Sequence, residues 1–271
     1  MRELERDLPT DAQPSATARE ALPALAILGA GRMGGALAKA AREEGLEVTL
    51  AGRETALAAA QNAEAALLCV PDEAIEEVAA SIGEAIPPLR LVGHTSGATS
   101  LEALAPAAEC GAATFSLHPL QTVPNADAEL VGAACAVTGS EPEAERFAAR
   151  LGERLGMRAF AVPDERRAAY HAAASMASNF LIALEESAAG LLERTGIEDA
   201  RALLAPLVRT SAGNWADHGS AALTGPIARG DAATVARHLA ALRETAPELV
   251  PIYEELAELT RELAEARRAA R

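Results

Sequence analysis

Aromatic residues are scarce in this sequence, since Phe, Trp and Tyr make up only 3% of the 271 residues while 50% are hydrophobic. The core must therefore be built largely from alanine, leucine and valine, which suits closely packed helices and favours a helix-rich α/β protein. Cysteine is also scarce: the chain holds only Cys69, Cys110 and Cys135, with no CxxC pair. An odd number of widely spaced cysteines predicts neither a disulfide framework nor a zinc site, so we expect no metal and a reducing cytoplasm.

Long apolar runs and positive charge are lacking as well. No segment reaches about 18 uninterrupted apolar residues, the length that a transmembrane helix needs. The formal net charge of -15 repels phosphate backbones and anionic lipids, so we expect neither a nucleic acid nor a membrane as partner. Residues 1–22 are polar and lack the apolar stretch of a secretory signal. We therefore expect a disordered extension there and a cytoplasmic protein.

A glycine-rich run occupies residues 25–35, which read Leu-Ala-Ile-Leu-Gly-Ala-Gly-Arg-Met-Gly-Gly. It places Gly-x-Gly-x-x-Gly between a short apolar strand and a helix-forming segment. Gly29 permits the tight turn, Gly31 lets the backbone approach a pyrophosphate, and Gly34 lets the helix pack close to the strand. The N–H groups and the dipole at the start of that helix then hold the phosphates. The pattern predicts dinucleotide binding through Gly29, Gly31, Arg32, Met33 and Gly34.

The end of the second predicted strand bears on the choice of cofactor. A fold specific for NAD normally places an acidic residue there, on the ribose 2′-hydroxyl, whereas this sequence has Arg53. A guanidinium can pair with a 2′-phosphate, so we predict NADP(H), with Thr55 as a further hydrogen-bond donor. Two alternatives stay open. Glu54 would bind the ribose of NAD if the turn were shifted by one residue, and Arg53 could be an ordinary solvated arginine.

Strands alternate with amphipathic helical segments from residue 24 to about residue 162, which predicts a doubly wound parallel sheet with helices on both faces. The predicted strands are Ala24–Leu28, Glu47–Ala51, Ala65–Val70, Leu89–His94, Ala113–Leu117, Ala133–Val137 and Arg158–Val162. After Pro163 the sequence is helical to its end. We therefore expect an extension (1–22), a Rossmann dinucleotide-binding domain (23–163) and an all-helical substrate and dimerisation domain (164–271).

Polar clusters follow three of the predicted strands, at the edge where open parallel sheets bind ligands. Val70 and Pro71, after the third strand, are predicted cofactor contacts. The clusters after the fourth and fifth strands are residues 94–97 and 116–121. Their predicted site residues are Ser96, Ser116 and Gln121 for the substrate and His118 for catalysis. Each cluster is also typical of turns, because Ser, Asp, Gly and Pro are the usual turn residues.

The segment after Pro163 predicts one long helix, since Asp164 is a good N-cap and no breaker follows before Gly196. Residues 170–184 are apolar nearly all round and are therefore expected to be buried. A polar stripe at helical spacing interrupts them, formed by His171, Ser175, Ser178 and Asn179.

This polar stripe needs partners, because an unpaired buried polar group costs about 1–3 kcal/mol. The partner is either another helix or a cleft that holds ligand and water. We favour the cleft and predict His171 as general acid, because histidine changes charge near neutral pH. Ser175 and Asn179 would orient a carbonyl or carboxylate, with Ser178 as a further substrate contact.

Shorter helices are expected at Ile197–Ser211, Asp231–Thr245 and Pro247–Arg268, with a loop at Gly213–Gly230. This loop contains most of the run Leu-Thr-Gly-Pro-Ile-Ala-Arg-Gly-Asp, which ends at Asp231. Its Gly-Pro pair makes a turn, and Asp231 can cap the following helix. Arg229 has no such structural task, so it is either a clamp for a substrate carboxylate or a surface arginine.

Together these motifs resemble the bacterial Rossmann-like proteins that carry the helical domain of unknown function DUF2520. The resemblance covers the chain from about residue 24 onward and rests on residues 29–34, 94–97, 116–121, 170–179 and 223–231. It implies a helical domain of the 6-phosphogluconate dehydrogenase-like type, a homodimer formed through that domain, and a site between the two domains. Relatives of the group include β-hydroxyacid dehydrogenases, ketopantoate reductases and pyrroline-5-carboxylate reductases, so the resemblance also implies an NADP-linked reductase.

One departure from these relatives concerns lysine. The hydroxyacid and ketopantoate enzymes use a lysine on the long helix, followed about one turn later by asparagine. Asn179 matches the asparagine, but Ser175 or His171 replaces the lysine, and the only lysine of the chain is Lys39.

The sequence therefore predicts an NADP(H)-dependent oxidoreductase acting on CH–OH or CH–NH groups, which transfers hydride to a small carbonyl-bearing carboxylate of the 2-oxo or 3-hydroxy acid type. One alternative is a cyclic imine reductase of the pyrroline-5-carboxylate type, which tolerates a missing lysine because its imine is already protonated. The other is a non-catalytic protein that senses NADP(H).

Overall fold

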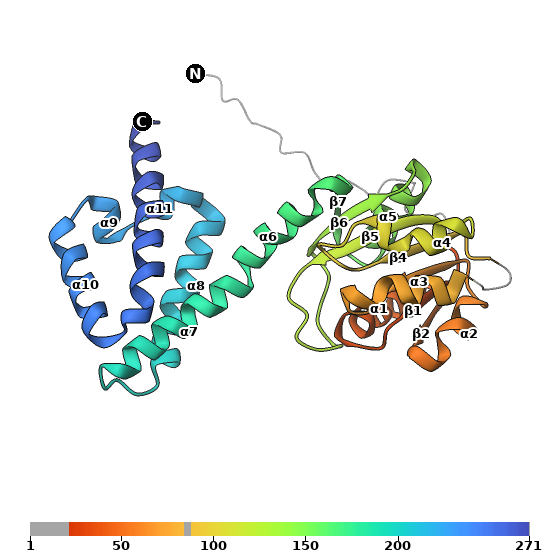
Figure 1. Cartoon of the computed structure of the whole chain (residues 1–271), viewed down its shortest axis with the longest axis horizontal. Helices are drawn as coiled ribbons and strands as arrows, with labels where there is room; N and C mark the ends of the chain where they lie inside the picture. Colours follow the sequence, from red (N-terminus) through yellow and green to blue (C-terminus); the bar gives the residue numbers. More distant parts are fainter. Residues whose placement is uncertain (1–21, 84–87, 271) are drawn as a thin grey trace, which may run out of the picture. The chain divides into compact units, whose positions relative to one another are not determined.

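The computed structural model describes residues 22–83 and 88–270, and Figure 1 labels their helices and strands. The chain divides into two compact units, Met1–Ser175 and Met176–Arg271. The first unit contains the sheet and the second is helical. The division lies later than the predicted boundary after Pro163, because the first helix after Pro163 belongs with the sheet. Apart from Leu22, the predicted extension over residues 1–22 lies outside the described residues.

All the predicted strands are present, and within the described residues they form one sheet of seven strands in the order β2-β1-β3-β4-β5-β6-β7. Their bounds are β1 Leu25–Leu28, β2 Val48–Ala51, β3 Ala65–Leu68, β4 Leu91–His94, β5 Ala113–Leu120, β6 Ala134–Gly139 and β7 Arg158–Ala161. Each lies within two or three residues of its predicted bounds. The predicted doubly wound α/β architecture is confirmed.

The expectation of an all-parallel sheet is wrong at one place. β5 runs parallel to β4, but β6 pairs with β5 in the antiparallel direction. A parallel pair needs a long crossover, usually a helix, and the described residues between Leu120 and Ala134 contain no helix. Pairing with β6 also lengthens β5, so that Ser116 and His118 lie inside this strand, whereas the sequence predicts His118 in a loop after it.

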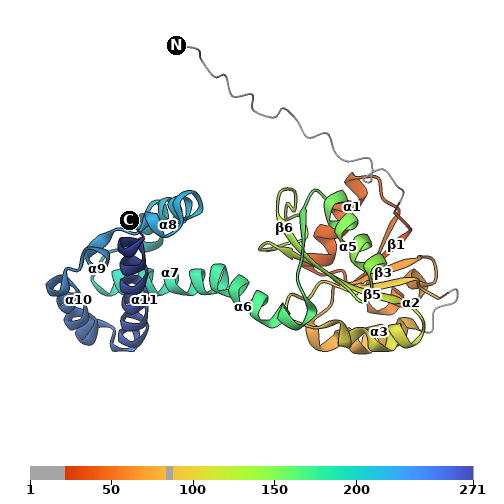
Figure 2. The same cartoon turned by 90° about the horizontal axis from the view of Figure 1, so that it is seen from above.

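Helices cover both faces of the sheet, as Figure 2 shows. α1 and α5 pack on one face, and α2, α3 and α4 pack on the other. Their bounds are α1 Arg32–Glu43, α2 Ala56–Ala60, α3 Ile75–Gly83, α4 Ala105–Glu109 and α5 Pro142–Arg154. Both cores consist mainly of aliphatic side chains, as the composition predicts. An aromatic exception is Phe115, whose ring meets Phe147 edge-on with 5.2 Å between centroids.

The carboxyl ends of β1 to β5 meet at one edge of the sheet, because these strands are mutually parallel. β1 lies between β2 and β3, so the strand order reverses its direction across the sheet at β1. Such a switch point is where open α/β sheets bind ligands. The glycine loop follows β1 and residues 69–72 follow β3, so both predicted clusters lie at this point.

The predicted long helix is broken into α6 (Arg167–Ala177) and α7 (Asn179–Arg194). Between them Ser178 has φ of -125° and ψ of -75°, outside the helical region, although its carbonyl already accepts the N–H of Ile182 in α7. Serine and asparagine compete with the helix for backbone hydrogen bonds, so a break is possible here without Gly or Pro. The predicted N-cap role of Asp164 is also wrong, because its carboxylate accepts the N–H of Leu101 at 3.1 Å instead.

The helical unit continues with α8 (Ala200–His218), α9 (Gly225–Arg229), α10 (Ala232–Thr245) and α11 (Val250–Ala269). The predicted loop at Gly213–Gly230 is therefore wrong over much of its length. α8 continues to His218 even though it contains Pro206. The cap at Asp231 is confirmed, because its carboxylate accepts the N–H of Thr234 at 3.0 Å. None of the described helices combines the length and the apolar composition that crossing a bilayer requires.

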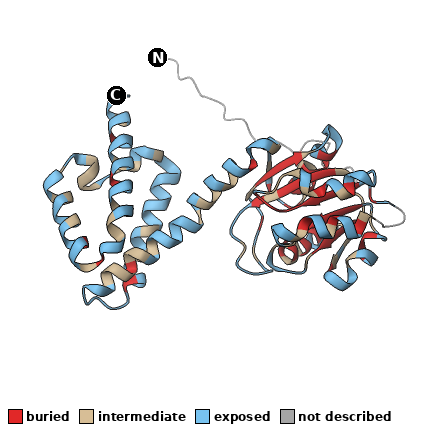
Figure 3. Ribbon diagram, in the orientation of Figure 1, coloured by how far each residue is buried: buried red, intermediate tan, exposed pale blue. Residues whose placement is uncertain are grey.

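The helices after the sheet unit leave many large apolar side chains exposed, in contrast to the buried strands (Figure 3). Met176, Phe180 and Ile182 are 63%, 62% and 58% exposed. The further exposed side chains include Leu203, Leu207, Trp215, Ile252 and Leu259. The expectation that residues 170–184 are buried is thus wrong for the single chain, because no described segment covers this apolar surface.

Candidate functional site

The glycine loop has the steric properties of a dinucleotide-binding loop. Gly29 has φ of +117°, which side chains rarely adopt, and a Cβ there would overlap the carbonyl group of Cys69. A Cβ at Gly34 would overlap the carbonyl oxygen of Gly29, so glycine lets α1 pack this close to β1. Around the Cβ position of Gly31, in contrast, no described atom lies within 4 Å, and this residue is exposed. The backbone at the start of α1 is therefore open to a ligand.

The first turn of α1 suits an anionic group. Its N-cap is Gly31, which offers no side-chain acceptor, and the turn contains no acidic residue. The free N–H groups and the positive end of the helix dipole therefore face the opening. Arg32 is exposed and Met33 is half-buried in this turn. The half-buried Val70 borders the loop, because its Cγ1 atom lies 3.2 Å from the Cβ position of Gly29, and the exposed Pro71 follows it.

Arg53 begins a short 3-10 turn directly after β2, the strand next to β1. Its side chain is exposed and makes no hydrogen bond or ion pair with any residue that the structure describes. Thr55 and Glu54 in the same turn are exposed as well. A free guanidinium at this sheet edge fits a phosphate group on the 2′-position of a ribose.

A row of polar side chains crosses one face of the sheet near its carboxyl edge. His94 on β4, Ser116 on β5 and Thr138 on β6 are paired in register, so their side chains lie side by side. All three are buried. Neither the ring nitrogens of His94 nor the hydroxyl of Ser116 makes a hydrogen bond of normal geometry with a described residue. Packing alone does not explain buried polar atoms without partners, since each costs about 1–3 kcal/mol.

Arg167, in the first turn of α6, is fully buried against this row. Its guanidinium donates hydrogen bonds to the hydroxyl of Thr138 at 3.1 Å, to the carbonyl oxygen of Thr99 at 2.8 Å and to the carbonyl oxygen of Ser96. Burial lowers the pKa of Arg167, and the nearby carboxylate of Asp164 opposes this shift. Arg167 thus fastens the start of α6 to the loop after β4.

Ser96, a predicted substrate contact, is engaged in its own turn. Its hydroxyl lies 2.8 Å from a carboxylate oxygen of Asp72, to which it can donate, and accepts the N–H groups of Ala98 at 3.2 Å and Thr99 at 3.0 Å. This is the turn chemistry that the sequence left open as the alternative. The contact with Asp72 joins the loop after β4 to the loop after β3.

His118 and His171 converge on Gly97, and Tyr170 contacts His118. The Nδ1 atom of His118 lies 2.7 Å from the hydroxyl oxygen of Tyr170. The rings of His118 and His171 meet edge-on with 5.6 Å between centroids. A Cβ at Gly97 would lie 2.9 Å from Nε2 of His118 and would overlap Nδ1 of His171, so glycine leaves both imidazoles their places. The structure therefore brings together the two histidines that the sequence predicts as catalytic.

Burial keeps the strand histidines of this cluster neutral. It lowers the pKa of His94 to about 4, with the charge of Arg167 as a second cause. It also lowers the pKa of His118 to about 4, and charge on His171 or Arg167 acts in the same direction. Burial raises the pKa of Tyr170 to about 12, so the phenol keeps its proton at neutral pH. Within the described parts of the chain, no three His, Cys, Asp or Glu side chains are placed to share a metal ion.

Of the other predicted site residues, one lies directly after β5, one lies on α6 and three belong to the helical unit. Gln121 is exposed, and its side-chain oxygen accepts the N–H of Thr122 at 3.0 Å. Ser175 lies half-buried one turn beyond His171 on α6. Ser178, Asn179 and Arg229 belong to the helical unit. Their roles stay predictions.

Arg229 lines a cavity of about 340 Å³ inside the helical unit. Thr224, Arg267 and Arg268 line it too, and none of the described lining residues is acidic. One guanidinium nitrogen of Arg267 donates to the carbonyl oxygen of Leu223 at 3.4 Å. A basic lining fits a small carboxylate or phosphate, although the carboxylate of Asp231 lies close enough to Arg229 to interact with its charge.

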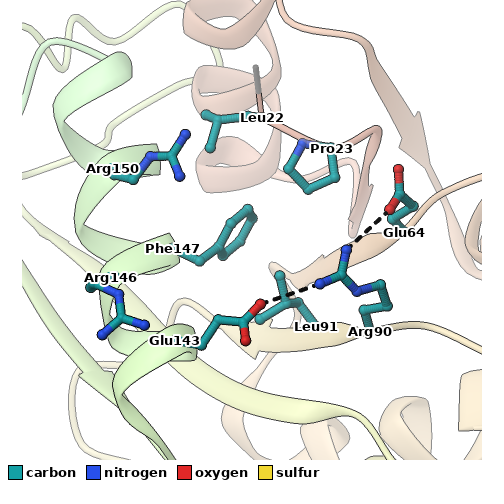
Figure 4. Close-up of a pocket in the computed structure, with 9 residues that line it drawn as sticks. All are labelled: Leu22, Pro23, Glu64, Arg90, Leu91, Glu143, Arg146, Phe147 and Arg150. Carbon is teal, nitrogen blue, oxygen red and sulfur yellow. Dashed lines mark hydrogen bonds and ion pairs between the residues drawn. The ribbon is translucent and has the colours of Figure 1, made fainter. Parts of the chain in front are cut away.

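Another cavity, of about 410 Å³, lies at the amino ends of β1, β3 and β4 (Figure 4). Its Arg90 pairs with Glu64 at 3.6 Å and with Glu143 at 3.2 Å, so the charge of this arginine is already balanced. Open parallel sheets bind ligands at the opposite edge. We therefore place the candidate site at the glycine loop and the histidine cluster.

Two family models match the chain. Residues 133–260 match the model described as "Domain of unknown function (DUF2520)", and residues 51–119 match the model of the Rossmann-like domain. Over these two ranges the chain is similar to the Rossmann-like and DUF2520 families. The resemblance that the sequence motifs indicate is thereby confirmed. Among curated proteins, no sequence matches this one.

Solved structures of the same fold cover nearly the whole of this chain. Protein TM1727 from Thermotoga maritima has a TM-score of 0.73 and 23% identity, over 90% of this chain and 99% of that one. Protein BF3122 from Bacteroides fragilis, provisionally described as an NADP oxidoreductase, has a TM-score of 0.72 and 22% identity, over 89% and 98%. A reductive aminase from Aspergillus terreus, solved with NADPH and ethyl levulinate, has a TM-score of 0.64 and 17% identity, over 92% and 99%. At these identities the likeness shows the fold.

Arg167 and Tyr170 are members of the cluster that the sequence motifs do not indicate. Arg167 stands in a charged stretch, and only its burial distinguishes it from a surface residue. Tyr170 offers a signal, because it precedes His171 directly and is one of only 2 tyrosines in the chain.

Stability should fall in acid because His94 is buried as the neutral imidazole. The unfolded chain protonates this histidine near pH 6.5, whereas the folded protein resists protonation down to about pH 4. Stability from His94 is thus present above about pH 6.5 and is lost as the pH falls toward 4. Between pH 7 and pH 4.5 the free energy of unfolding, measured in urea, should fall by about 2–3 kcal/mol less in His94→Gln than in the unsubstituted protein. His218→Gln, at an exposed histidine, serves as control and should follow the unsubstituted protein. Identical losses for all three proteins would contradict the expectation.

Proposed function

We propose that the protein is an NADP(H)-dependent oxidoreductase that transfers hydride to the carbonyl group of a small carbonyl-bearing carboxylate. The observation that carries this proposal is that the glycine loop and the histidine pair lie at the same edge of the sheet. The open glycine loop follows β1, and the His118–His171 pair lies against the loop after β4, two strands away in the same parallel array. The fold that the chain shares with a reductase solved with NADPH also supports the proposal. The nicotinamide supplies the hydride, while the residues of the chain bind, orient and protonate the substrate.

His171 is the proposed proton donor of this reaction. His118 is neutral at working pH, so it serves to orient the substrate rather than to give up a proton. Ser175 and Asn179 are the proposed partners of a carbonyl or carboxylate, with Ser178 as a further contact. Arg229 is the proposed partner of the substrate carboxylate, which the arginine-lined cavity beside it supports.

NADP(H) is the proposed cofactor because Arg53 presents an unpaired guanidinium beside the glycine loop. Arg53→Ala should weaken NADPH binding about tenfold or more, since a charged hydrogen bond to phosphate is lost, and should leave NADH binding nearly unchanged. Titration calorimetry with both nucleotides measures the two dissociation constants. Arg42→Ala removes another exposed arginine, at the end of α1, and should change neither constant. Equal weakening of NADPH and NADH would contradict the cofactor choice.

The proposed substrate is a 2-oxo acid, and the cyclic imine of the pyrroline-5-carboxylate type is the second candidate. The missing lysine favours the imine, because a protonated imine needs less acid catalysis, and the shared fold with a reductive aminase agrees with it. The proposed donor His171 favours the carbonyl compound, whose oxygen must be protonated.

A substrate panel separates these candidates. We expect consumption of NADPH with 2-oxo acids, a loss in kcat of about a hundredfold or more in His171→Ala, and no loss in His238→Ala. In the same panel, Arg229→Ala should raise KM for substrates that carry a carboxylate and leave their esters unaffected. Turnover of cyclic imines that does not depend on His171 would favour the imine reductase. Tight NADPH binding without any turnover would instead identify a sensing protein.

A homodimer through the helical unit is proposed because α7 and its neighbours expose Phe180, Ile182 and other large apolar side chains. Light scattering after gel filtration should give twice the mass of one chain. Phe180→Glu should shift the protein toward the monomer, because it places a charge in the covered apolar face. Leu57→Glu alters an exposed apolar residue of the sheet unit, which is 41% exposed, and should leave the dimer intact. A monomer without any substitution would contradict this assembly.

A further inference from the structure

Tyr170 has no place in the function proposed above, although its hydroxyl makes one of the few side-chain contacts in the histidine cluster. We propose that Tyr170 is a positioning residue, which donates its hydroxyl proton to Nδ1 of His118 and so holds His118 in the tautomer with its proton on Nε2. The proposal rests on the proposed function only for its effect on catalysis, because the tautomer is a property of the protein itself.

The direction of this hydrogen bond follows from the two groups that make it. The oxygen of Tyr170 and Nδ1 of His118 are 2.7 Å apart. A neutral imidazole has one nitrogen with a proton and one with a lone pair, and the lone pair is a stronger acceptor than a phenol oxygen. The phenol keeps its proton, because burial raises its pKa to about 12. Tyr170 is therefore the donor, and the proton of His118 must lie on Nε2.

The surroundings of Nε2 agree with this tautomer. Nε2 of His118 lies 2.9 Å from the Cβ position of Gly97, and Nδ1 of His171 lies near the same position. That Nδ1 atom is buried and has no hydrogen-bond partner among the described residues. When His171 is neutral and its Nδ1 atom carries the lone pair, a proton on Nε2 of His118 avoids the repulsion of two lone pairs directed at the same space. The charged or titratable groups around His118 are His171, Arg167, Asp72, His94 and Tyr170, and together with burial they leave the imidazole neutral above about pH 4.

The tautomer determines what His118 can offer to a substrate. An N–H on Nε2 donates a hydrogen bond to an oxygen, and its effect grows as a carbonyl oxygen gains negative charge during hydride transfer. A protonated imine nitrogen has no lone pair to accept it. The tautomer therefore favours a carbonyl substrate over a cyclic imine.

Nitrogen-15 NMR of the full-length protein at pH 7 tests the tautomer directly, because the protonated and bare nitrogens of an imidazole have well-separated shifts. The chain has only 5 histidines, and the signals absent from His118→Gln identify His118. We expect the Nε2–H form to dominate, and its ratio to the Nδ1–H form to fall about fivefold in Tyr170→Phe, which loses one hydrogen bond.

The chain supplies a matched control in its other tyrosine. Tyr253 lies 2.7 Å from Nδ1 of His238 in the helical unit, so Tyr253→Phe removes the same kind of contact elsewhere. This variant should alter the signals of His238 and leave those of His118 unchanged. With a substrate that is turned over, Tyr170→Phe should lower kcat about tenfold with little change in KM, and Tyr253→Phe should change neither.

The outcomes separate this proposal from the proposed function. A proton on Nδ1 of His118 in the unsubstituted protein, or an unchanged tautomer in Tyr170→Phe, would overturn the role of Tyr170. The expected tautomer in a protein that reduces no substrate would support the contact and refute the oxidoreductase.

Discussion

The fully buried guanidinium of Arg167 is the interaction on which the candidate site depends. It reaches from the first turn of α6 to the backbone carbonyls of the loop after β4 and to the hydroxyl of Thr138 on β6. A buried cation without such acceptors costs several kcal/mol, so α6 can begin only where these acceptors are within reach. The carboxylate of Asp164 strengthens the attachment by accepting the N–H of Leu101 in the same loop. The position at which α6 begins is therefore determined largely by contacts with the segment that follows β4.

The side chains of the histidine cluster on α6 lie one helical turn after Arg167. Tyr170 and His171 lie three and four residues after Arg167, so they share its face of α6 and point toward the sheet. They meet His118 on β5 there, and the missing side chain of Gly97 leaves space for both imidazoles. This explains why the sheet unit extends to Ser175, although the sequence after Pro163 is helical. The first turns of α6 belong to the sheet unit because their polar side chains have their partners there.

The strands could be predicted because a buried strand is a short apolar run bounded by turn residues, and all of them lie close to their expected places. The direction of β6 could not be predicted, since an apolar run indicates a strand and not its orientation. The break at Ser178 carries no Gly or Pro to mark it. In the site, the glycine loop has a local pattern that fixes its geometry, whereas the contact between Tyr170 and His118 joins residues 52 positions apart on a helix and a strand. Neither residue carries a sign of the other, so only the packing of α6 on the sheet reveals their contact.

The cation of this cluster is an arginine, Arg167, and not a lysine as in the related dehydrogenases. A lysine brings a mobile charge to a substrate, whereas the cation here, Arg167, is held by acceptors of the protein itself. Its charge acts on its neighbours instead: together with burial it keeps His94 and His118 unprotonated. A neutral imidazole has one N–H and one lone pair, so the partner of one nitrogen decides what the other can offer. Oriented dipoles of this kind interact strongly where little water screens them. Burial is thus the main reason that the strand histidines stay neutral, and the charge of Arg167, which is held by three acceptors of the sheet unit, adds to it.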